Sequence, residues 1–497
     1  MLQVVHRMTT NLWDNLDLPM TWGNSLLKTL WKGKGSKKDP AKYRGISIGS
    51  TVCKLVMNII LNRLRPWYES QLSDHQNGFR GNRGTTDGIY TVKRIQQISS
   101  RKKQPLFLLF VDLSAAFDHV PRKWLFESVN LRFRIDQRPK VITILKTLYS
   151  KTSLTYQEVT FTTSSGVRQG GPESPLLFNL YIDFVMRLFI EKSRIENIDF
   201  FHHCYRIYAK LFTREERASM RRNSKRPSGN SLQPWCGYAD DLVLFLKSKV
   251  GLQRAIEILD NLFTSFGLSI NTSKTETMII NFSEDVYPPS IVTLRGIDLK
   301  NVTEFKYLGS YINYNEPNTG ETEINHRIQL SQVKFAEMSN VLQNFNVNLT
   351  TRIIFLNSFV RSRLTYACQN WNLTRYQYDR LDITYRMFLR RMVRGGFRFI
   401  DEVNGDYGYV INNARLHEIC GTSDVSLFIK SQQRNYAMHV VRMDITRSVK
   451  LLMFNDDKYV RRGRPAKSLF EQVVENENIS IDQFCTLALS KKSGRST

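Results

Sequence analysis

Two adjacent aspartates, Asp240 and Asp241, lie between two short apolar runs and constrain this chain more than any other feature. The first run ends at Tyr238, and the second is Leu-Val-Leu-Phe-Leu over 242–246. This pattern predicts a strand, a tight turn and a second strand, with both carboxylates at the turn. Like charges this close repel each other, and a bound cation is the usual remedy. A two-metal phosphoryl-transfer site requires such a turn.

A third aspartate ends another apolar run far upstream. Residues 106–111 are continuously apolar behind Pro105, which predicts a strand buried on both faces, and Asp112 follows directly. A carboxylate at the end of a buried strand is costly unless it is paired. Together with Asp240 and Asp241, Asp112 would complete an all-oxygen cage of the kind that suits Mg²⁺. Taken alone, an aspartate that ends a strand is more often a cap or turn residue.

The chain carries a series of short motifs that resemble, in the same order, those of the reverse transcriptases of non-LTR retrotransposons. The series covers about residues 15 to 400. The forms Tyr-Arg-x-Ile-Ser, Gly-Phe-Arg and Tyr-Leu-Gly-Ser favour the non-LTR branch. In chain order, the residues that carry the resemblance are Lys42–Ser47, Gln76–Arg80 with Arg83–Asp87, Asp112–Asp118, Gly166–Pro172 with Ser174–Asn179, Tyr238–Asp241, Gly267–Asn271 with Lys274–Thr275, and Phe305–Ser310.

The periodicity of apolar residues predicts a chain that mixes helices and strands in layers. Helices are expected within 1–30, where Trp22, Leu26 and Trp31 are loosely spaced for one, and over 51–68, 176–190 and 252–266. The expected strands cover 106–111, 234–246 and 276–282.

The resemblance narrows this to an α+β right-hand polymerase with fingers, palm and thumb, an antiparallel-sheet palm and a helical C-terminal region. The expected units are fingers over 1–104, a palm over 105–315 with finger elements and a basic insertion near 205–231, a helical thumb over 316–400, and a basic C-terminal region over 401–497.

The resemblance also implies an activity, which is templated addition of deoxynucleotides to a primer 3′-hydroxyl. Asp112, Asp240 and Asp241 are expected to hold two Mg²⁺ ions, with Mn²⁺ as the alternative. The other expected site residues are Lys274 as proton donor or neutralising charge at the pyrophosphate, Arg44 and Lys38 at the triphosphate, Leu113 through its carbonyl, Phe117 as a gate against ribonucleotides, Gln169 and Gly170 at the nascent base pair, and Tyr307, Leu308 and Gly309 at the primer end.

The charge balance agrees with a nucleic-acid partner. A formal net charge of +26 and a pI of about 9.8 suit a polyanion, and phosphates are the obvious one. An apolar content of 41% argues against a disordered basic tail. The expected partners are therefore template RNA, a DNA primer and deoxynucleoside triphosphates.

Cysteine usage and hydropathy bear on the compartment. The six cysteines are scattered and form no pair with zinc-ligand spacing, so reduced, buried thiols are expected. There is no signal peptide and no apolar stretch of the roughly 18 residues that a membrane span needs. A nuclear or cytoplasmic protein that is neither secreted nor membrane-spanning is the expectation.

Two departures from the family pattern leave alternatives open. The chain begins almost at the fingers and has no Cys/His finger, so either a separate endonuclease supplies the DNA nick or the chain is a truncated copy of an element. A catalytically inactive nucleic-acid-binding remnant and a splicing cofactor like group II intron maturases remain alternatives, although the intact aspartates favour an active enzyme. The basic stretches 205–231 and Arg461–Pro465 are either solvated segments or further nucleic-acid contacts.

Overall fold

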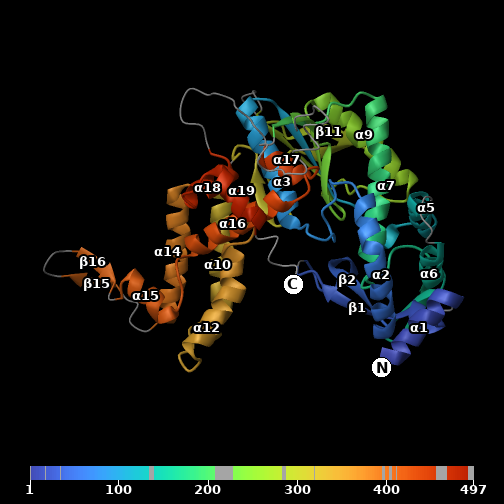
Figure 1. Cartoon of the computed structure of the whole chain (residues 1–497), viewed down its shortest axis with the longest axis horizontal. Helices are drawn as coiled ribbons and strands as arrows, with labels where there is room; N and C mark the ends of the chain where they lie inside the picture. Colours follow the sequence, from blue (N-terminus) through green and yellow to red (C-terminus); the bar gives the residue numbers. More distant parts are fainter. Residues whose placement is uncertain are drawn as a thin grey trace.

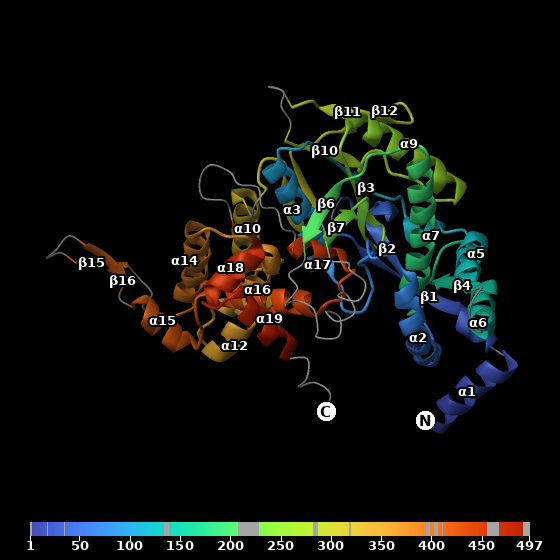
Figure 2. The same ribbon diagram turned by 45° about the horizontal axis from the view of Figure 1, so that its top comes forward.

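The structure is a computed structural model, and it describes residues 2–16, 18–33, 35–133, 139–206, 228–281, 287–317, 320–393, 398–401, 406–409, 411–454 and 467–490. Elements α1 to α9 form one lobe, and the helices from α10 to α16 form a second lobe beside it (Figures 1 and 2). No helix within these ranges combines the length and the apolar character needed to cross a lipid bilayer.

A four-stranded antiparallel sheet lies at the centre of the first lobe. Its strands run in the order β10-β3-β9-β8. All six residues of β3 are buried, as the continuous apolar run predicts. The strands are β3 (Leu106–Val111), β8 (Trp235–Tyr238), β9 (Asp241–Leu246) and β10 (Glu276–Ile280).

The two faces of this sheet contribute to different hydrophobic cores. Leu109 of β3 packs in the core that holds α2 (Thr51–Gln71), α7 (Ser174–Ile195) and α9 (Lys249–Ser265). Its neighbours Leu108 and Phe110 pack in a second core with α3 (Thr85–Lys102) and the C-terminal helices. Because successive side chains of a strand point to opposite faces, one buried strand joins both cores.

A second sheet forms the fingers and corrects one prediction. The helix within 1–30 lies at α1 (Leu2–Asn15), whereas the segment around Leu26 and Trp31 is a strand, so the helical reading of that segment was wrong. Seven residue pairs tie this strand to its antiparallel neighbour, and this pairing outweighs a loose helical spacing. The sheet runs β2-β1-β4-β5, with β1 (Asn24–Trp31), β2 (Tyr43–Gly49), β4 (Thr152–Tyr156) and β5 (Val159–Thr163).

Short helices and hairpins complete the first lobe. The insertion predicted near 205–231 begins and ends in a two-stranded antiparallel pair, and residues 207–227 lie outside the described residues. The further elements are η1 (Met20–Gly23), η2 (Pro40–Lys42), α4 (Ala116–His119), α5 (Arg122–Phe133), α6 (Pro139–Ser150), β6 (His202–Arg206), β7 (Ser228–Leu232), β11 (Ser290–Leu294), β12 (Ile297–Lys300), β13 (Glu304–Tyr307) and β14 (Ser310–Asn313).

The chain becomes helical after about residue 320, as predicted. Trp371 and Tyr385 lie in a third hydrophobic core shared by these helices. The α+β fold with an antiparallel palm sheet and a helical C-terminal region is therefore confirmed. The elements here are α10 (Glu321–Glu337), α11 (Ser339–Leu342), α12 (Leu349–Phe355), η4 (Leu356–Arg361), α13 (Ser362–Leu364), η5 (Cys368–Asn370) and α14 (Arg375–Met392).

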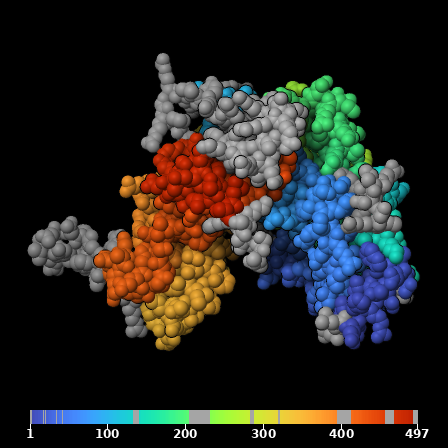
Figure 3. All heavy atoms as spheres, in the orientation of Figure 1, coloured from blue at the N-terminus to red at the C-terminus, as the bar shows by residue number. Residues whose placement is uncertain are grey.

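The C-terminal region contains helices that pack back onto the fingers and palm. In the space-filling view these helices, in red, lie directly against the blue fingers segment (Figure 3). The basic Arg461–Pro465 segment lies outside the described residues. The elements are β15 (Arg398–Asp401), β16 (Asp406–Tyr409), α15 (Asn413–Cys420), α16 (Val425–Arg442), α17 (Ser448–Met453), α18 (Leu469–Asn476) and α19 (Ile481–Ser490).

A largely buried ion network fastens this region to the fingers. Arg447 lies 3.3 Å from Asp74 and 3.4 Å from Asp87, and Arg83 pairs with Asp74 at 2.8 Å. The Tyr436 hydroxyl donates to Asp87 at 3.0 Å. Two carboxylates from the fingers thus depend on a guanidinium that comes from more than 350 residues later in the chain.

Replacing Arg447 by Met should destabilise the fold, because both carboxylates lose a buried counter-ion while the side-chain length is kept. We expect a loss of about 3 kcal/mol, measured by urea unfolding. The matched control is Arg434→Met, which removes a partly exposed pair with Glu477 at 3.0 Å and should cost less than about 1 kcal/mol. Equal losses in the two variants would contradict this description of the C-terminal contact.

Candidate active site

The β8–β9 hairpin places the paired aspartates at a two-residue turn. Tyr238 pairs with Asp241 across the ladder, so Ala239 and Asp240 form the turn itself. Ala239 is buried and has a φ of +58°, a region that residues with a Cβ rarely occupy. The strand–turn–strand prediction is confirmed, and the turn holds a strained backbone at its first residue.

The neighbouring strand brings the third aspartate to the same edge of the sheet. Val111 pairs with Leu242, and therefore Asp112 leaves β3 beside Asp241 at the start of β9. The backbone of Asp112 is fixed on its other side, because its carbonyl accepts from the Asn271 amide at 2.8 Å. The structure thus brings together residues that are 128 positions apart, as the sequence predicts.

The motif that contains Lys274 lies next to this edge. The Thr275 hydroxyl accepts from the Asp112 amide at 3.2 Å, and Leu113 forms a β-bridge with Ile270. The ammonium of Lys274 lies 3.4 Å from a carboxylate oxygen of Asp112. Leu113 and Lys274 therefore lie directly beside the first aspartate.

The two aspartates of the hairpin have raised pKa values. Partial burial, together with the negative charges of Asp240 and Asp112, raises the pKa of Asp241 to about 6. Burial raises the pKa of Asp240 as well, with Asp112 adding to the rise while Arg44 and Lys274 oppose it. The site is therefore short of positive charge.

The donor set fits a hard divalent cation in its chemistry. The three aspartates at this edge offer carboxylate oxygens, the ligand type that Mg²⁺ and Mn²⁺ accept. Burial and, after it, the negative charges of neighbouring aspartates raise the pKa values of Asp240 and Asp241, and a bound cation would relieve the repulsion between these charges. In the described ranges, no three acidic, histidine or cysteine side chains already stand as a closed ligand cage. The carboxylates would have to turn toward an ion to hold it.

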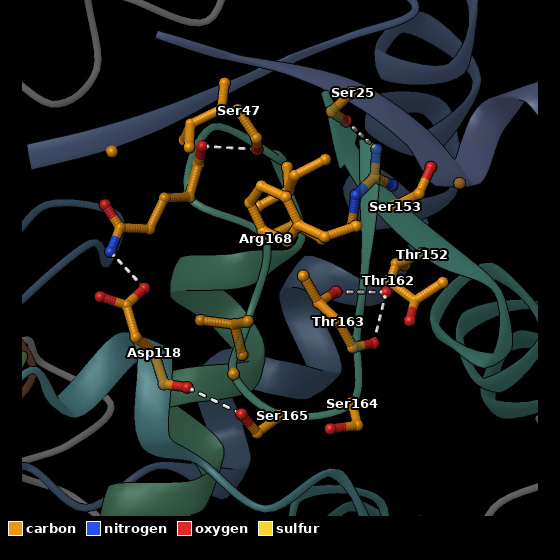
Figure 4. Close-up of a pocket in the computed structure, with 18 of the residues that line it drawn as sticks. Ser25, Ser47, Asp118, Thr152, Ser153, Thr162, Thr163, Ser164, Ser165 and Arg168 are labelled. Carbon is orange, nitrogen blue, oxygen red and sulfur yellow. Dashed lines mark hydrogen bonds between the residues drawn. The ribbon is translucent and has the colours of Figure 1, made fainter. Parts of the chain in front are cut away.

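Gln169, which the sequence predicts to line the nascent base pair, is joined by hydrogen bonds to residues of two other motifs. The Gln169 amide donates to Asp118 at 2.6 Å, and its backbone carbonyl accepts from both the amide and the hydroxyl of Ser47 at 2.7 Å (Figure 4). These three residues line a cavity of about 390 Å³ between the fingers sheet and the loop before α7. The ring of Phe117 stacks on Phe178 with centroids 4.0 Å apart.

Gly170 follows Gln169 with a φ of +116° and lies against the fingers strand β2. A Cβ added at this glycine would lie 2.5 Å from the carbonyl oxygen of Ser47, so only glycine fits the contact. Ser47 and Asp118 were not predicted as site residues. They belong to motifs that the sequence analysis recognised, but only the folded contacts reveal their link to Gln169.

The three residues predicted at the primer end form the β13–β14 turn. Leu308 and Gly309 both have positive φ, at +46° and +84°. The Tyr366 hydroxyl donates to the Leu308 carbonyl at 2.8 Å, and Arg327 donates to the Gly309 carbonyl. Tyr307 is buried, with its hydroxyl 3.8 Å from the sulfur of Cys236 on β8, so it supports the turn from within the core.

The two basic residues predicted at the triphosphate differ in position. Arg44 is exposed on β2, and its charge lowers the pKa of Asp240. Lys38 is exposed in the loop between β1 and β2, where its amide donates to the Ser36 hydroxyl at 3.2 Å. Among the described contacts, none links Lys38 to the carboxylates.

The reverse transcriptase (RNA-dependent DNA polymerase) family model matches residues 35–312, which is more than half of the chain. The chain belongs to the reverse transcriptase family. The match spans the motifs from the first fingers motif to the primer-end turn and confirms the family resemblance. The carboxylate edge of the central sheet, with Asp112, Asp240 and Asp241, lies within the matched residues.

Relatives of this reverse transcriptase-family chain include polyproteins of R2 retrotransposable elements. It is 25% identical over 286 residues to the Pol polyprotein of the type-2 retrotransposable element R2DM of Drosophila melanogaster, covering 55% of this chain and 24% of the relative. It is 24% identical over 361 residues to the type-1 element R2 polyprotein of Nasonia vitripennis, covering 67% and 31%. The chain thus spans about a quarter to a third of the length of these relatives.

Among solved structures, the chain is similar to apo telomerase from Candida tropicalis. The two are 11% identical, with 90% of this chain and 74% of that chain covered and a TM-score of 0.41.

Asp241→Asn should stabilise this reverse transcriptase-family chain at pH 7.5 when divalent ions are removed by chelation. Because folding raises the pKa of Asp241 to about 6, the ionised wild-type residue destabilises the native state above that pH. We expect a gain of about 1 kcal/mol, less than the full shift implies because the side chain is exposed to screening water. The gain should fade as the pH drops through 6, measured by urea unfolding.

The control is Asp298→Asn, which changes an exposed carboxylate on β12. A stability difference for Asp241→Asn that stays constant from pH 7.5 to pH 4 would contradict mutual repulsion at the turn.

Proposed function

We propose that this chain is an RNA-directed DNA polymerase that extends a primer 3′-hydroxyl with deoxynucleoside triphosphates. The observation that carries the proposal is the meeting of Asp112 with Asp240 and Asp241 at one edge of the palm sheet, within a reverse transcriptase-family chain. A partly exposed cluster of like charges does not stabilise the fold, and a catalytic role would explain why it is present.

The three aspartates would hold the divalent ions, two Mg²⁺ or Mn²⁺, with the Leu113 carbonyl as a further oxygen donor. When bound, such ions lower the pKa of the primer hydroxyl and neutralise the charge of the triphosphate and of the leaving pyrophosphate. Lys274, already 3.4 Å from Asp112, supplies a positive charge or a proton to the pyrophosphate.

The incoming nucleotide would lie between the palm edge and the fingers. Arg44 contacts its triphosphate, with Lys38 as a second cation from the neighbouring loop. Phe117, held by stacking on Phe178, blocks a ribose 2′-hydroxyl. The Gln169 and Gly170 backbone, fixed against β2, lines the nascent base pair.

The template–primer duplex would lie in the open gap between the thumb helices and the fingers, which separates the yellow and blue parts of the surface (Figure 3). A net charge of +26 supports binding of template RNA and a DNA primer there. The turn at Leu308 and Gly309 would position the primer end, because Tyr366 and Arg327 fix it to the thumb. A separate endonuclease would supply the nicked DNA.

The cysteines support a reducing compartment. The five with described side chains are buried and free, and the side chain of Cys204 lies outside the described residues. We therefore place the chain in the nucleus or cytoplasm, where thiols stay reduced.

Primer extension on poly(rA)/oligo(dT) with Mg²⁺ tests the proposal. The wild-type chain should incorporate thymidine nucleotides, and Asp240→Asn should lower the rate by at least about 10³-fold because a metal-binding charge is lost. The control is Asp199→Asn, which removes only a surface pair with Lys247 and should leave the rate unchanged.

Incorporation by Asp240→Asn at the wild-type rate would overturn the assignment of the turn. Absence of incorporation by the wild-type chain, together with retained binding of the duplex, would identify an inactive nucleic-acid-binding remnant instead.

Phe117→Ala should relax sugar selection. Removing the ring opens space for a 2′-hydroxyl, so the preference for deoxynucleotides over ribonucleotides should fall by about 10- to 100-fold. Single-nucleotide incorporation kinetics with dTTP and UTP measure the ratio, and Phe117→Tyr, which keeps the ring, serves as the control. An unchanged ratio for Phe117→Ala would exclude the gate.

A further inference from the structure

Gln76 reaches the catalytic turn from the fingers. Its side-chain carbonyl accepts from the Ala239 amide at 2.9 Å, and its side-chain amide donates to the Ala239 carbonyl at 3.1 Å. Gln76 is fully buried and Ala239 is 3% exposed, so water cannot replace either bond. One side chain thus satisfies both backbone groups of the first residue of the turn.

The turn needs this support because its backbone is strained. Ala239 adopts a φ of +58°, where its Cβ crowds the backbone, and such residues persist only when their surroundings hold them. Asp240 and Asp241 follow directly, and Asp241 lies beside Asp112 where the adjacent strand ends, so three like charges meet here. Without an external restraint, both strain and repulsion favour opening the turn.

The segment that carries Gln76 is itself fixed to the palm. The amide of Asn77 donates to the Gly237 carbonyl at 2.8 Å, and the Gly237 amide donates to the His75 carbonyl at 2.9 Å. These bonds add the segment to the β8 edge of the sheet as a short parallel partner. Buried Arg80 donates to the Gln76 carbonyl at 2.9 Å, which anchors the residue from behind.

A glycine permits this close approach. A Cβ added at Gly78 would lie 2.5 Å from the Ala239 nitrogen. The Gly78 amide donates to the same Gln76 oxygen at 2.9 Å, and its carbonyl accepts from Asn179 of α7 at 2.6 Å. The fingers backbone is thus held in direct contact with the turn.

We infer that Gln76 is a positioning residue for the polymerase reaction. It touches neither nucleotide nor primer. By holding Ala239, it keeps the carboxylates of Asp240 and Asp241 beside Asp112 and so sets the affinity of the site for divalent ions. This inference rests on the proposed function in one respect, which is that the ions at the site are Mg²⁺ or Mn²⁺.

The decisive variant is Gln76→Met, which keeps the length and approximate volume of the side chain and removes both bonds to Ala239 as well as the bond from the Gly78 amide. Mn²⁺ binding to the purified protein, measured by electron paramagnetic resonance, should weaken by about 10-fold. The Mg²⁺ concentration for half-maximal primer extension should rise by a similar factor, while the KM for the nucleotide should stay within about 2-fold of wild type.

The matched control is Gln233→Met. Gln233 is also a buried glutamine beside β8, 1% exposed, and it donates to the Trp235 carbonyl at 2.8 Å, but none of its described contacts reaches the turn. It should lose comparable thermal stability while binding Mn²⁺ as the wild type does. If Gln233→Met loses as much Mn²⁺ affinity as Gln76→Met, the loss in both variants reflects general destabilisation of the fold, and the inference is overturned.

A second variant provides the test if Gln76→Met does not fold. Gly78→Ala keeps the amide of Gln76 but forces the segment away from Ala239, so it should weaken Mn²⁺ binding in the same direction. Wild-type affinity in a folded Gln76→Met or Gly78→Ala protein would overturn the inference.

Hydrogen exchange separates this inference from the proposed function. The Ala239 amide should be protected in the wild type and should exchange at least about 10-fold faster in Gln76→Met, whether or not the protein polymerises DNA. If the wild type neither binds Mn²⁺ nor extends a primer while its Ala239 amide is protected, the proposed function is refuted. The restraint of Ala239 by Gln76 then still stands. An unprotected Ala239 in the wild type would refute the restraint itself.

Discussion

Three carboxylates repel one another at one edge of the central buried sheet, and the surrounding structure must hold them together against this repulsion. Asp112 and Asp241 leave adjacent strands side by side, and Asp240 lies in the turn between β8 and β9. Burial and the charges of neighbouring aspartates raise the pKa values of Asp240 and Asp241, so folding brings these carboxylates together against an electrostatic cost. Packing in the two hydrophobic cores on either side of β3 offsets this electrostatic cost. The hydrogen bond from the Ala239 amide to Gln76 of the fingers segment offsets it further.

The same fingers segment connects the site to distant parts of the chain. Loop residue Asp74 pairs with Arg447 from the C-terminal helices, and two residues later Gln76 bonds the catalytic turn. On the other side of the palm, the thumb residue Tyr366 bonds the turn at Leu308. Gln76 and Tyr366 therefore bond the two backbone turns on which the proposed chemistry depends, and the C-terminal helices fasten the segment that carries Gln76.

Much of the site could be predicted because its residues sit at the ends of strands that are recognisable from local pattern. The continuous apolar run before Asp112 and the paired runs around Asp240 predicted the strands, and motif order predicted that they meet. The contact of Gln76 with Ala239 joins residues 163 positions apart, and no periodicity encodes such a pair. It required the folded backbone.

Two further features show where local pattern is insufficient. The segment around Leu26 has a spacing loosely compatible with a helix, yet seven cross-strand pairs make it a strand. The packing of the C-terminal helices depends on single ion pairs such as Arg447 with Asp87, which sequence alone does not distinguish from a solvated basic surface. In both cases tertiary pairing decides the outcome over local preference.

Cleavage of the backbone by bound Fe²⁺ tests most directly whether the three aspartates form one ion site. Fe²⁺ replaces Mg²⁺ at oxygen ligands and, with peroxide, generates hydroxyl radicals that cut the nearest peptide bonds. We predict cuts next to Asp112 and within 239–242, mapped by mass spectrometry with template–primer bound and suppressed by excess Mg²⁺. Cuts confined to other segments, or cuts at these positions that excess Mg²⁺ does not suppress, would contradict a shared ion site at the palm edge.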